Sequence, residues 1–182
     1  MALIILYVFL ALLGAVGIWQ LAVLAFETRD KNRKFRAAVD QAGKEARPLL
    51  VVGGPWGSKP ARRWLNKPAH GAGDVCLDID PRAIHGHPAG VVASVTRIPF
   101  GNGTFGAVFA SHLLEHLATT GDARLALEEL HRVAARVFIV CPSRQSIAGW
   151  VIPEHRLWVW QKGDEIYLKQ RGESGKLEVY RC

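Results

Sequence analysis

The sequence predicts a doubly wound, mostly parallel α/β sheet with a C-terminal antiparallel hairpin, preceded by one transmembrane helix. Three observations lead to this prediction. The first 26 residues carry no charged side chain, five short valine-rich runs follow Pro48, and two strand-like segments lie near the end of the chain. With 182 residues and 20.0 kDa, the chain has room for one domain beside the helix.

The apolar segment 1–26 is long enough to cross a membrane. Gln20 is its only strongly polar interruption. A helix rises about 1.5 Å per residue and the hydrocarbon core is about 30 Å thick, so about 20 residues suffice. A cleaved signal peptide is the alternative, but no basic segment precedes the apolar run and no small-residue cleavage site precedes Glu27. We therefore expect a retained single-pass anchor.

The segment 27–47 is a charged, helical connector that ends before Pro48. It carries seven basic and four acidic residues, a net charge of +3 out of the chain's +7. Basic residues beside a span favour a cytoplasmic location for the domain on that side, and they attract anionic lipid headgroups. Because part of the basic excess lies here and the rest of the chain has no Lys/Arg run with interleaved aromatic residues, nucleic acid is not expected as a partner.

The cysteines favour a reducing compartment. Cys76, Cys141 and Cys182 are odd in number and have no paired spacing, which argues against a disulfide framework and a Cys-x-x-Cys zinc site. No basic neighbour in sequence would activate Cys141, so a buried, inert thiol is expected.

The domain 48–182 contains short runs typical of strands buried on both faces. They lie at 49–52, 75–77, 91–95, 107–110 and 137–140. The segments 165–171 and 177–181 instead predict an antiparallel hairpin.

Ligands of such sheets bind at the carboxyl ends of the strands. A glycine turn, Gly53-Gly54-Pro55-Trp56-Gly57, comes after the first run, and Asp78 directly follows the second. Glycines let the backbone approach a ligand, although turns are also glycine-rich for structural reasons alone. A carboxylate about twenty residues further on can accept both hydroxyls of a ribose.

Two later motifs carry a family resemblance. They are IPFGNGTFGAVFASHLLEHL, which begins at Ile98, and ALEELHRV, which begins at Ala126. With the glycine turn and Asp78, they resemble the class I S-adenosylmethionine-dependent methyltransferases, of the small-molecule, methyltransferase domain 11-like type that includes the ubiquinone and menaquinone enzymes. The resemblance covers 48–143 and implies a Rossmann-like fold with S-adenosylmethionine as cofactor.

The resemblance also implies a role for individual residues. The methionine end of the cofactor would lie at the glycine loop, its ribose at Asp78 and its adenine at the end of the third strand. His112, after the fourth strand, is the candidate catalytic base, with a structural role in the loop as the alternative. The implied cofactor-binding residues are Gly53, Gly54, Gly57, Asp78, Ile79, Ser94, Val95 and Ser111.

Five places depart from the family pattern. Val51 and Ser94 replace acidic residues, Gly106 replaces an aspartate, Pro55 replaces a glycine, and Ala134-Ala135 stands for the family's Leu-Lys-Pro-Gly-Gly. Asp78 keeps its charge. The fold is therefore better supported than cofactor binding.

The segment 112–116 also matches the zinc motif His-x-x-Glu-His. It begins at a strand end rather than inside a helix, and only the distant Glu178 offers a third ligand, so no metal is expected. Core packing is the favoured role for Trp150, Trp158 and Trp160, with a substrate pocket or the bilayer interface as alternatives.

These observations favour two functions. The first is a membrane-anchored methyltransferase acting on a small or lipidic acceptor, the bilayer being its other partner. The second is a catalytically degenerate methyltransferase fold that serves as a membrane-tethered binding or assembly module, with a membrane protein as its partner.

Overall fold

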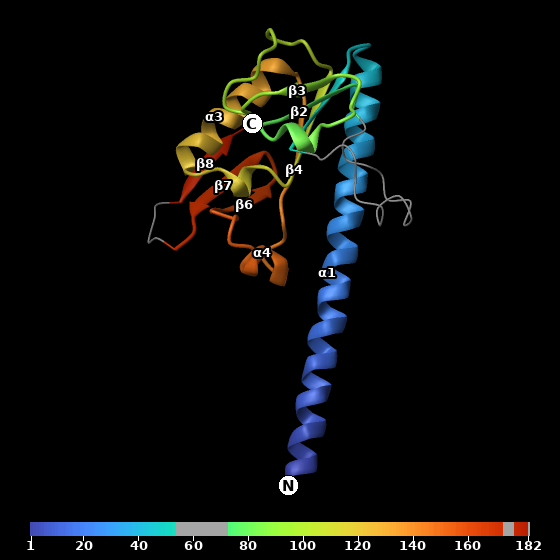
Figure 1. Ribbon diagram of the computed structural model, residues 1–182, viewed down its shortest axis with the longest axis vertical. Coiled ribbons are helices and arrows are strands. Elements are labelled where there is room, and N and C mark those ends of the chain that lie inside the picture. The colour runs from blue at the N-terminus through green and yellow to red at the C-terminus, as the bar shows by residue number, and fades with distance from the viewer. Residues whose placement is uncertain (54–72, 173–176, 182) are drawn as a thin grey trace.

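The computed structural model describes residues 1–53, 73–172 and 177–181. The predictions for Gly54, Pro55, Trp56 and Gly57 lie outside the described residues. Within them, a long helix leads into a domain with two sheets (Figure 1).

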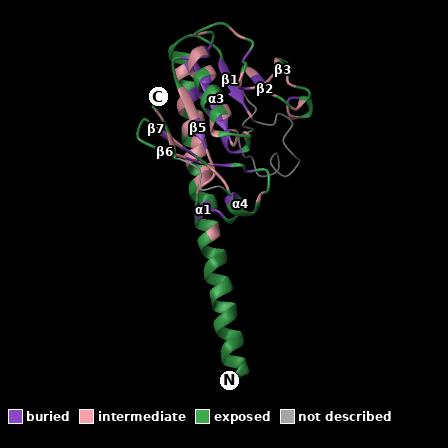
Figure 2. Ribbon diagram, turned by 90° about the vertical axis from the view of Figure 1, so that its left-hand side faces the viewer, coloured by how far each residue is buried: buried purple, intermediate pink, exposed green. Residues whose placement is uncertain are grey.

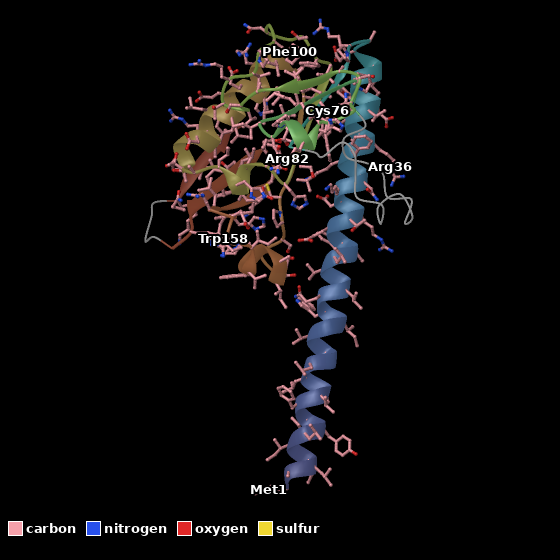
Figure 3. The ribbon with its side chains drawn as sticks, viewed as in Figure 1. Met1, Arg36, Cys76, Arg82, Phe100 and Trp158 are labelled. Atoms are coloured by element: carbon pink, nitrogen blue, oxygen red, sulfur yellow. The ribbon has the colours of Figure 1, made fainter. Side chains whose placement is uncertain are left out.

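The anchor and the connector form one continuous helix, α1 (Ala2–Lys44). It is long and apolar enough to cross a membrane, by length and composition only. The helix ends where Ala46 adopts a left-handed conformation (φ +50°) and the amide of Arg47 donates back to the carbonyl of Ala42. Figure 2 shows that most of the N-terminal half of α1 is exposed. Figure 3 shows that the side chains of α1 near Met1 lie away from the domain.

Five parallel strands form the central sheet in the order β3-β2-β1-β4-β5. The predicted parallel sheet is confirmed. The third strand is shorter than expected, because the Ser94 hydroxyl bonds the hydroxyl and the amide of Thr96 and turns the chain. The strands are β1 (Leu49–Val52), β2 (Val75–Asp78), β3 (Gly90–Val92), β4 (Ala107–Ser111) and β5 (Val137–Val140).

Helices cover both faces of this sheet. On one face, Ala38 and Ala42 of α1 are buried against a cluster that includes Val51 and Phe109, and Phe35 meets Phe109 edge to face at 5.2 Å. On the other face lies α3 (Thr120–Val133), which opens with a capping box between Thr119 and Asp122. Its buried residues are Ala123, Ala126, Leu127, Leu130 and Val133. The C-terminal third of α1 is therefore part of the domain core.

A second, antiparallel sheet closes the chain, in the order β6-β7-β8. The strands are β6 (Leu157–Lys162), β7 (Glu165–Gln170) and β8 (Glu178–Arg181). The predicted hairpin is confirmed as β7 and β8, but it forms a sheet of its own with β6, a strand that the sequence pattern did not predict. The described residues also contain three short helical segments, η1 (Pro81–Ala83), η2 (Leu114–His116) and α4 (Ile147–Val151).

Candidate cofactor and substrate site

The strand ends bring several predicted site residues to one edge of the sheet. The amide of Gly53 donates to the carbonyl of Leu77 at 3.2 Å, which places Gly53 beside the end of β2. On its other side, Val52 is in register with Ala110, next to Ser111. Gly53, Asp78 and Ser111 therefore lie near the place where the strand order reverses from β1 to β4, the usual ligand position in doubly wound sheets.

Gly53 has a structural reason to be glycine. Its φ of +69° is left-handed, and a Cβ there would lie 3.0 Å from the Cβ of Leu113. Any larger residue would be strained and would collide with this side chain. The described structure thus explains Gly53 by packing between the ends of β1 and β4.

Asp78 and Ile79 present a carboxylate and an apolar surface side by side. Asp78 ends β2 half-buried, and its Oδ1 accepts the amide of Asp80 at 2.9 Å. Asp80 instead caps η1 and pairs with Arg82, which lowers the pKa of its carboxyl. Ile79 is 72% exposed, so it offers open apolar surface to a flat ring.

The two residues predicted for adenine differ in their surroundings. The Ser94 hydroxyl lies 2.8 Å from that of Thr96 and is half-buried. The side chain of Val95 is buried in the core. A contact between Val95 and a ligand would therefore have to use its backbone.

His112 lies at the end of β4 beside a buried acid. Its Nδ1 is 3.2 Å from Oε1 of Glu115, which is 2% exposed, while the imidazole side chain is 37% exposed. When Glu115 is ionised, its carboxylate accepts a hydrogen bond from Nδ1, and a neutral His112 then has its lone pair at Nε2. His112 also has a left-handed φ of +53°, which is uncommon outside glycine. This pair is suited to accept a proton at Nε2.

Two buried side-chain oxygens at this place, Oγ of Ser111 and Oε2 of Glu115, make no hydrogen bond within the described part of the chain. Buried polar atoms normally have a hydrogen-bond partner, so these two oxygens are available to a ligand or a water molecule. The sequence presents Glu115 only as part of the His-x-x-Glu-His motif, whereas the structure pairs it with His112.

A histidine that lies far from the zinc motif in the sequence completes a possible donor set. Glu115, His116 and His155 bring ligand atoms within 4.8 Å of one another, whereas Glu178 accepts a hydrogen bond from Thr120 at 2.6 Å. A tetrahedral zinc ion needs its donors about 3.4 Å apart. The rings of His116 and His155 pack edge to face at 4.8 Å, which accounts for their closeness without an ion.

Two of the family departures lie beneath α1. A Cβ on Gly106 would come within 2.9 Å of Cα of Ala42, and Val51 is buried in the cluster that α1 covers. An aspartate at position 106 would collide with the helix backbone, and an acid at position 51 would be buried under it. The close approach of α1 therefore explains both substitutions.

The motif ALEELHRV in α3 binds the loop between the third and fourth strands. The guanidinium of Arg132 donates to the carbonyls of Phe100 and Ile98 at 2.8 and 2.9 Å, and it pairs with Glu129. Glu129 in turn accepts the amide of Ile98, and its bonds with Arg132 lower the pKa of its carboxyl. This network holds the loop between the third and fourth strands against α3.

The thiol of Cys141 lies just after β5. Burial raises its pKa well above the ordinary value, and the nearby Glu115 adds to this effect. The group stays a protonated thiol at neutral pH, in agreement with the expected inert role.

The strand order, the helices on both faces and the polar edge at the β1/β4 reversal define a Rossmann-like α/β fold. Residues 57–137 match the family model of a methyltransferase domain, which confirms the resemblance to the class I S-adenosylmethionine-dependent methyltransferases. A comparison with curated proteins gave no match.

Proposed function

We propose that this protein is a membrane-anchored methyltransferase that transfers a methyl group to a small or lipidic acceptor. The observation that carries the proposal is the edge at the β1/β4 reversal, where Asp78 and the His112–Glu115 pair both lie at strand ends. The family match supports it, since that family generally uses S-adenosylmethionine.

The described residues fit this cofactor. The Asp78 carboxylate is placed to accept the ribose hydroxyls, and the open surface of Ile79 suits the adenine ring. The bound cofactor supplies an activated methyl group. Methyl transfer is a direct displacement, so the protein mainly has to hold donor and acceptor in line.

His112 is the proposed base. With a hydroxyl acceptor, Nε2 of His112 would take up the proton that the oxygen loses on methylation, and the bound cofactor would supply the methyl group. Glu115 is a positioning residue, since it holds Nδ1 and stabilises the imidazolium that forms. The buried carboxylate thereby keeps Nε2 directed toward the acceptor.

The anchor brings the site to its substrate. A tether beside the bilayer raises the effective concentration of a lipid-soluble acceptor without a new contact. The basic residues after the span favour a cytoplasmic domain.

The direct test is transfer of a radiolabelled methyl group from S-adenosylmethionine into the organic-soluble fraction of membranes that carry the full chain. His112→Ala should lower the rate about 100-fold or more. Glu115→Gln should also lower the rate and shift its pH profile, which a purely structural role would not do. His85→Ala changes an exposed histidine elsewhere and serves as the matched control. An unchanged rate in His112→Ala would remove His112 from the chemistry.

The degenerate module remains the second candidate, and the substitutions at 51, 55, 94 and 106 are its basis. The packing of α1 on Val51 and Gly106 accounts for two of them, which weakens the case for lost activity. The two candidates differ in cofactor binding, because the module would bind none.

A further inference from the structure

Gln20 of α1 marks where the helix meets the domain. Its side-chain amide donates to the carbonyl of Gln145 at 3.0 Å, and its side-chain oxygen accepts the amide of Ile147 at 2.9 Å. Nineteen residues precede Gln20, and at about 1.5 Å each they span about 28 Å, close to the hydrocarbon thickness. Because these contacts with the domain are made at Gln20, the bilayer surface is assigned to this level, within the apolar segment 1–26 and before its end.

The short helix α4 lies at the same level. It begins at Ile147, which bonds Gln20, and Figure 1 shows it at the end of the domain nearest the free part of α1. Ile147, Trp150 and Val151 are 47%, 55% and 66% exposed. Exposed apolar side chains with a tryptophan among them suit the headgroup region of a bilayer.

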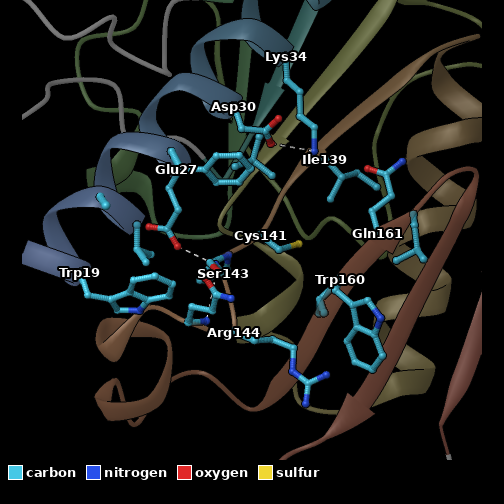
Figure 4. A pocket seen from close by; sticks show the side chains of 18 residues that line it. Trp19, Glu27, Asp30, Lys34, Ile139, Cys141, Ser143, Arg144, Trp160 and Gln161 are labelled. Carbon is cyan, nitrogen blue, oxygen red and sulfur yellow. Dashed lines mark hydrogen bonds and ion pairs between the residues drawn. The ribbon is translucent and has the colours of Figure 1, made fainter. Parts of the chain in front are cut away.

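A cavity of about 660 Å³ opens just above this level, between α1 and the strands β5 and β6 (Figure 4). This volume is in the usual range for small-molecule sites. One wall is apolar and comes from α1, with Trp19, Ala22, Val23 and Phe26. The opposite wall comes from the residues directly after β5 and from β6.

The charged side chains that line the cavity differ in whether they already have a partner in the protein. Glu27 accepts the amide of Ser143 at 2.6 Å, and Asp30 pairs with Lys34 at 3.2 Å. Arg144, by contrast, lies over the ring of Trp160 at 5.1 Å and has no carboxylate partner in the described part of the chain. The cavity thus combines an apolar wall with one cation whose charge is open.

We propose that this cavity binds an anionic membrane lipid, with its phosphate at Arg144 and its chains along the α1 wall. The inference rests on the proposed function and names its acceptor class. The amide of His112 donates to the carbonyl of Val140 at 2.9 Å, and the cavity is lined by Val140 and Cys141. This backbone contact brings the cavity to the end of β5, the strand next to the one that carries His112, although His112 itself does not line the cavity.

The test is calorimetry on the full chain in a neutral detergent, with dihexanoyl phosphatidylglycerol as the probe. Dihexanoyl phosphatidylcholine and inorganic phosphate are the comparison ligands. We expect saturable binding of phosphatidylglycerol, at least tenfold weaker binding of phosphatidylcholine, and weaker binding still of phosphate. Equal affinity for the two lipids, or phosphate binding as tight as the anionic lipid, would overturn the proposal.

Two pairs of variants locate the site. Arg144→Gln should weaken phosphatidylglycerol binding about tenfold, the usual effect of losing a charge-assisted hydrogen bond, and Arg144→Lys should restore most of it. Ala22→Phe fills the cavity and should weaken both lipids, whereas Ala25→Phe places the same ring on an exposed position of α1 outside the lining. Equal effects of the two phenylalanines would contradict this location.

The same samples, titrated with S-adenosylmethionine, separate the two proposals. Cofactor binding without selective lipid binding would overturn the lipid site alone. Selective lipid binding without cofactor binding would overturn the methyltransferase function and leave a lipid-binding module.

Discussion

Gly106 lies where α1 packs so closely on the sheet that a single added carbon atom would collide with the helix. The family has an aspartate at this position, yet here a single added Cβ would lie 2.9 Å from Cα of Ala42. Backbone atoms of a helix cannot move aside cheaply, so the residue must be glycine for the helix to lie as close as it does.

Gly106→Ala should therefore destabilise the domain by about 1 to 3 kcal/mol, the usual cost of overpacking. Gly101→Ala is the matched control, since its Cβ would meet only the Thr104 hydroxyl at 3.6 Å. Denaturant titration of the two variants measures the difference. Equal stability would mean that α1 does not press on Gly106.

We expect His131 to make the stability of the folded domain depend on pH. Its ring stacks on Tyr180 at 5.9 Å, and burial lowers its pKa below the ordinary value of 6.5. The unfolded chain then binds a proton more readily than the folded chain. Stability from the neutral imidazole is present above about pH 6.5 and is lost as the pH falls through the folded pKa.

His131→Phe should remove this part of the pH dependence. The measurement is the thermal midpoint of both proteins between pH 7.5 and 5, the midpoint of the wild type falling more steeply. Parallel curves would show that His131 does not contribute.

At the scale of elements, α1 joins an apolar segment long enough to cross a membrane to a helix of the domain core, without a break. Phe35, Ala38 and Ala42 contact the sheet, while the first turns have no contact with it. The helix thus fixes the orientation of the domain relative to the span, since Gln20 and Glu27 also bond the loop after β5.

Phe35→Ala should cost about 2 kcal/mol, because Phe35 is partly buried against Phe109. Val39→Ala, on an exposed position of the same helix, should change the stability by less than about 0.5 kcal/mol. The comparison uses the free energy of unfolding of the full chain in detergent. A similar loss in both variants would argue against docking through Phe35.

The sequence predicted the strands that short apolar runs mark on their own. The valine-rich runs at 49–52 and 137–140 match β1 and β5 residue for residue. The strand β6 was not predicted, because Leu157 to Trp160 form a continuous apolar run in sequence, and only the structure shows the alternation between the buried Leu157 and Val159 and the half-buried tryptophans. The charge that begins at Glu27 suggested a separate connector, although the helix continues unbroken.

The residues of the candidate site likewise fall into those that the sequence could predict and those that it could not. Sequence placed Asp78 and His112 at strand ends, because the order of strands and turns determines these positions. It could not connect Glu115 with His112, because the two meet only through the turn at η2. The reason for Gly106 depends on Ala42, a residue 64 positions away in the chain, and no local pattern carries that contact.

At the scale of the whole molecule, the proposed membrane anchor would hold the domain, with the exposed face of α4, against a membrane surface. The segment before Gln20 is the proposed span, and the helix beyond it belongs to the domain. In this proposed arrangement, the cavity between α1 and β6 would open next to the bilayer.

Ala11→Lys tests this arrangement. A lysine near the centre of a span costs about 3 kcal/mol on insertion scales, so more of the protein should leave the membrane on alkaline extraction. Ala25→Lys lies beyond Gln20 and should leave the membrane fraction unchanged. Equal release of both variants, or of neither, would contradict a span that ends near Gln20.

Calorimetric titration of the full chain with S-adenosylmethionine tests the central claim most directly. We expect saturable binding that Asp78→Ala weakens at least tenfold, as expected for loss of a charge-assisted hydrogen bond, and that Asp80→Ala, a change two residues away in the η1 cap, leaves intact. At a hundredfold excess over the dissociation constant, the cofactor should add about 2.7 kcal/mol of stability. No heat and no thermal stabilisation at millimolar cofactor would contradict the assignment as a methyltransferase.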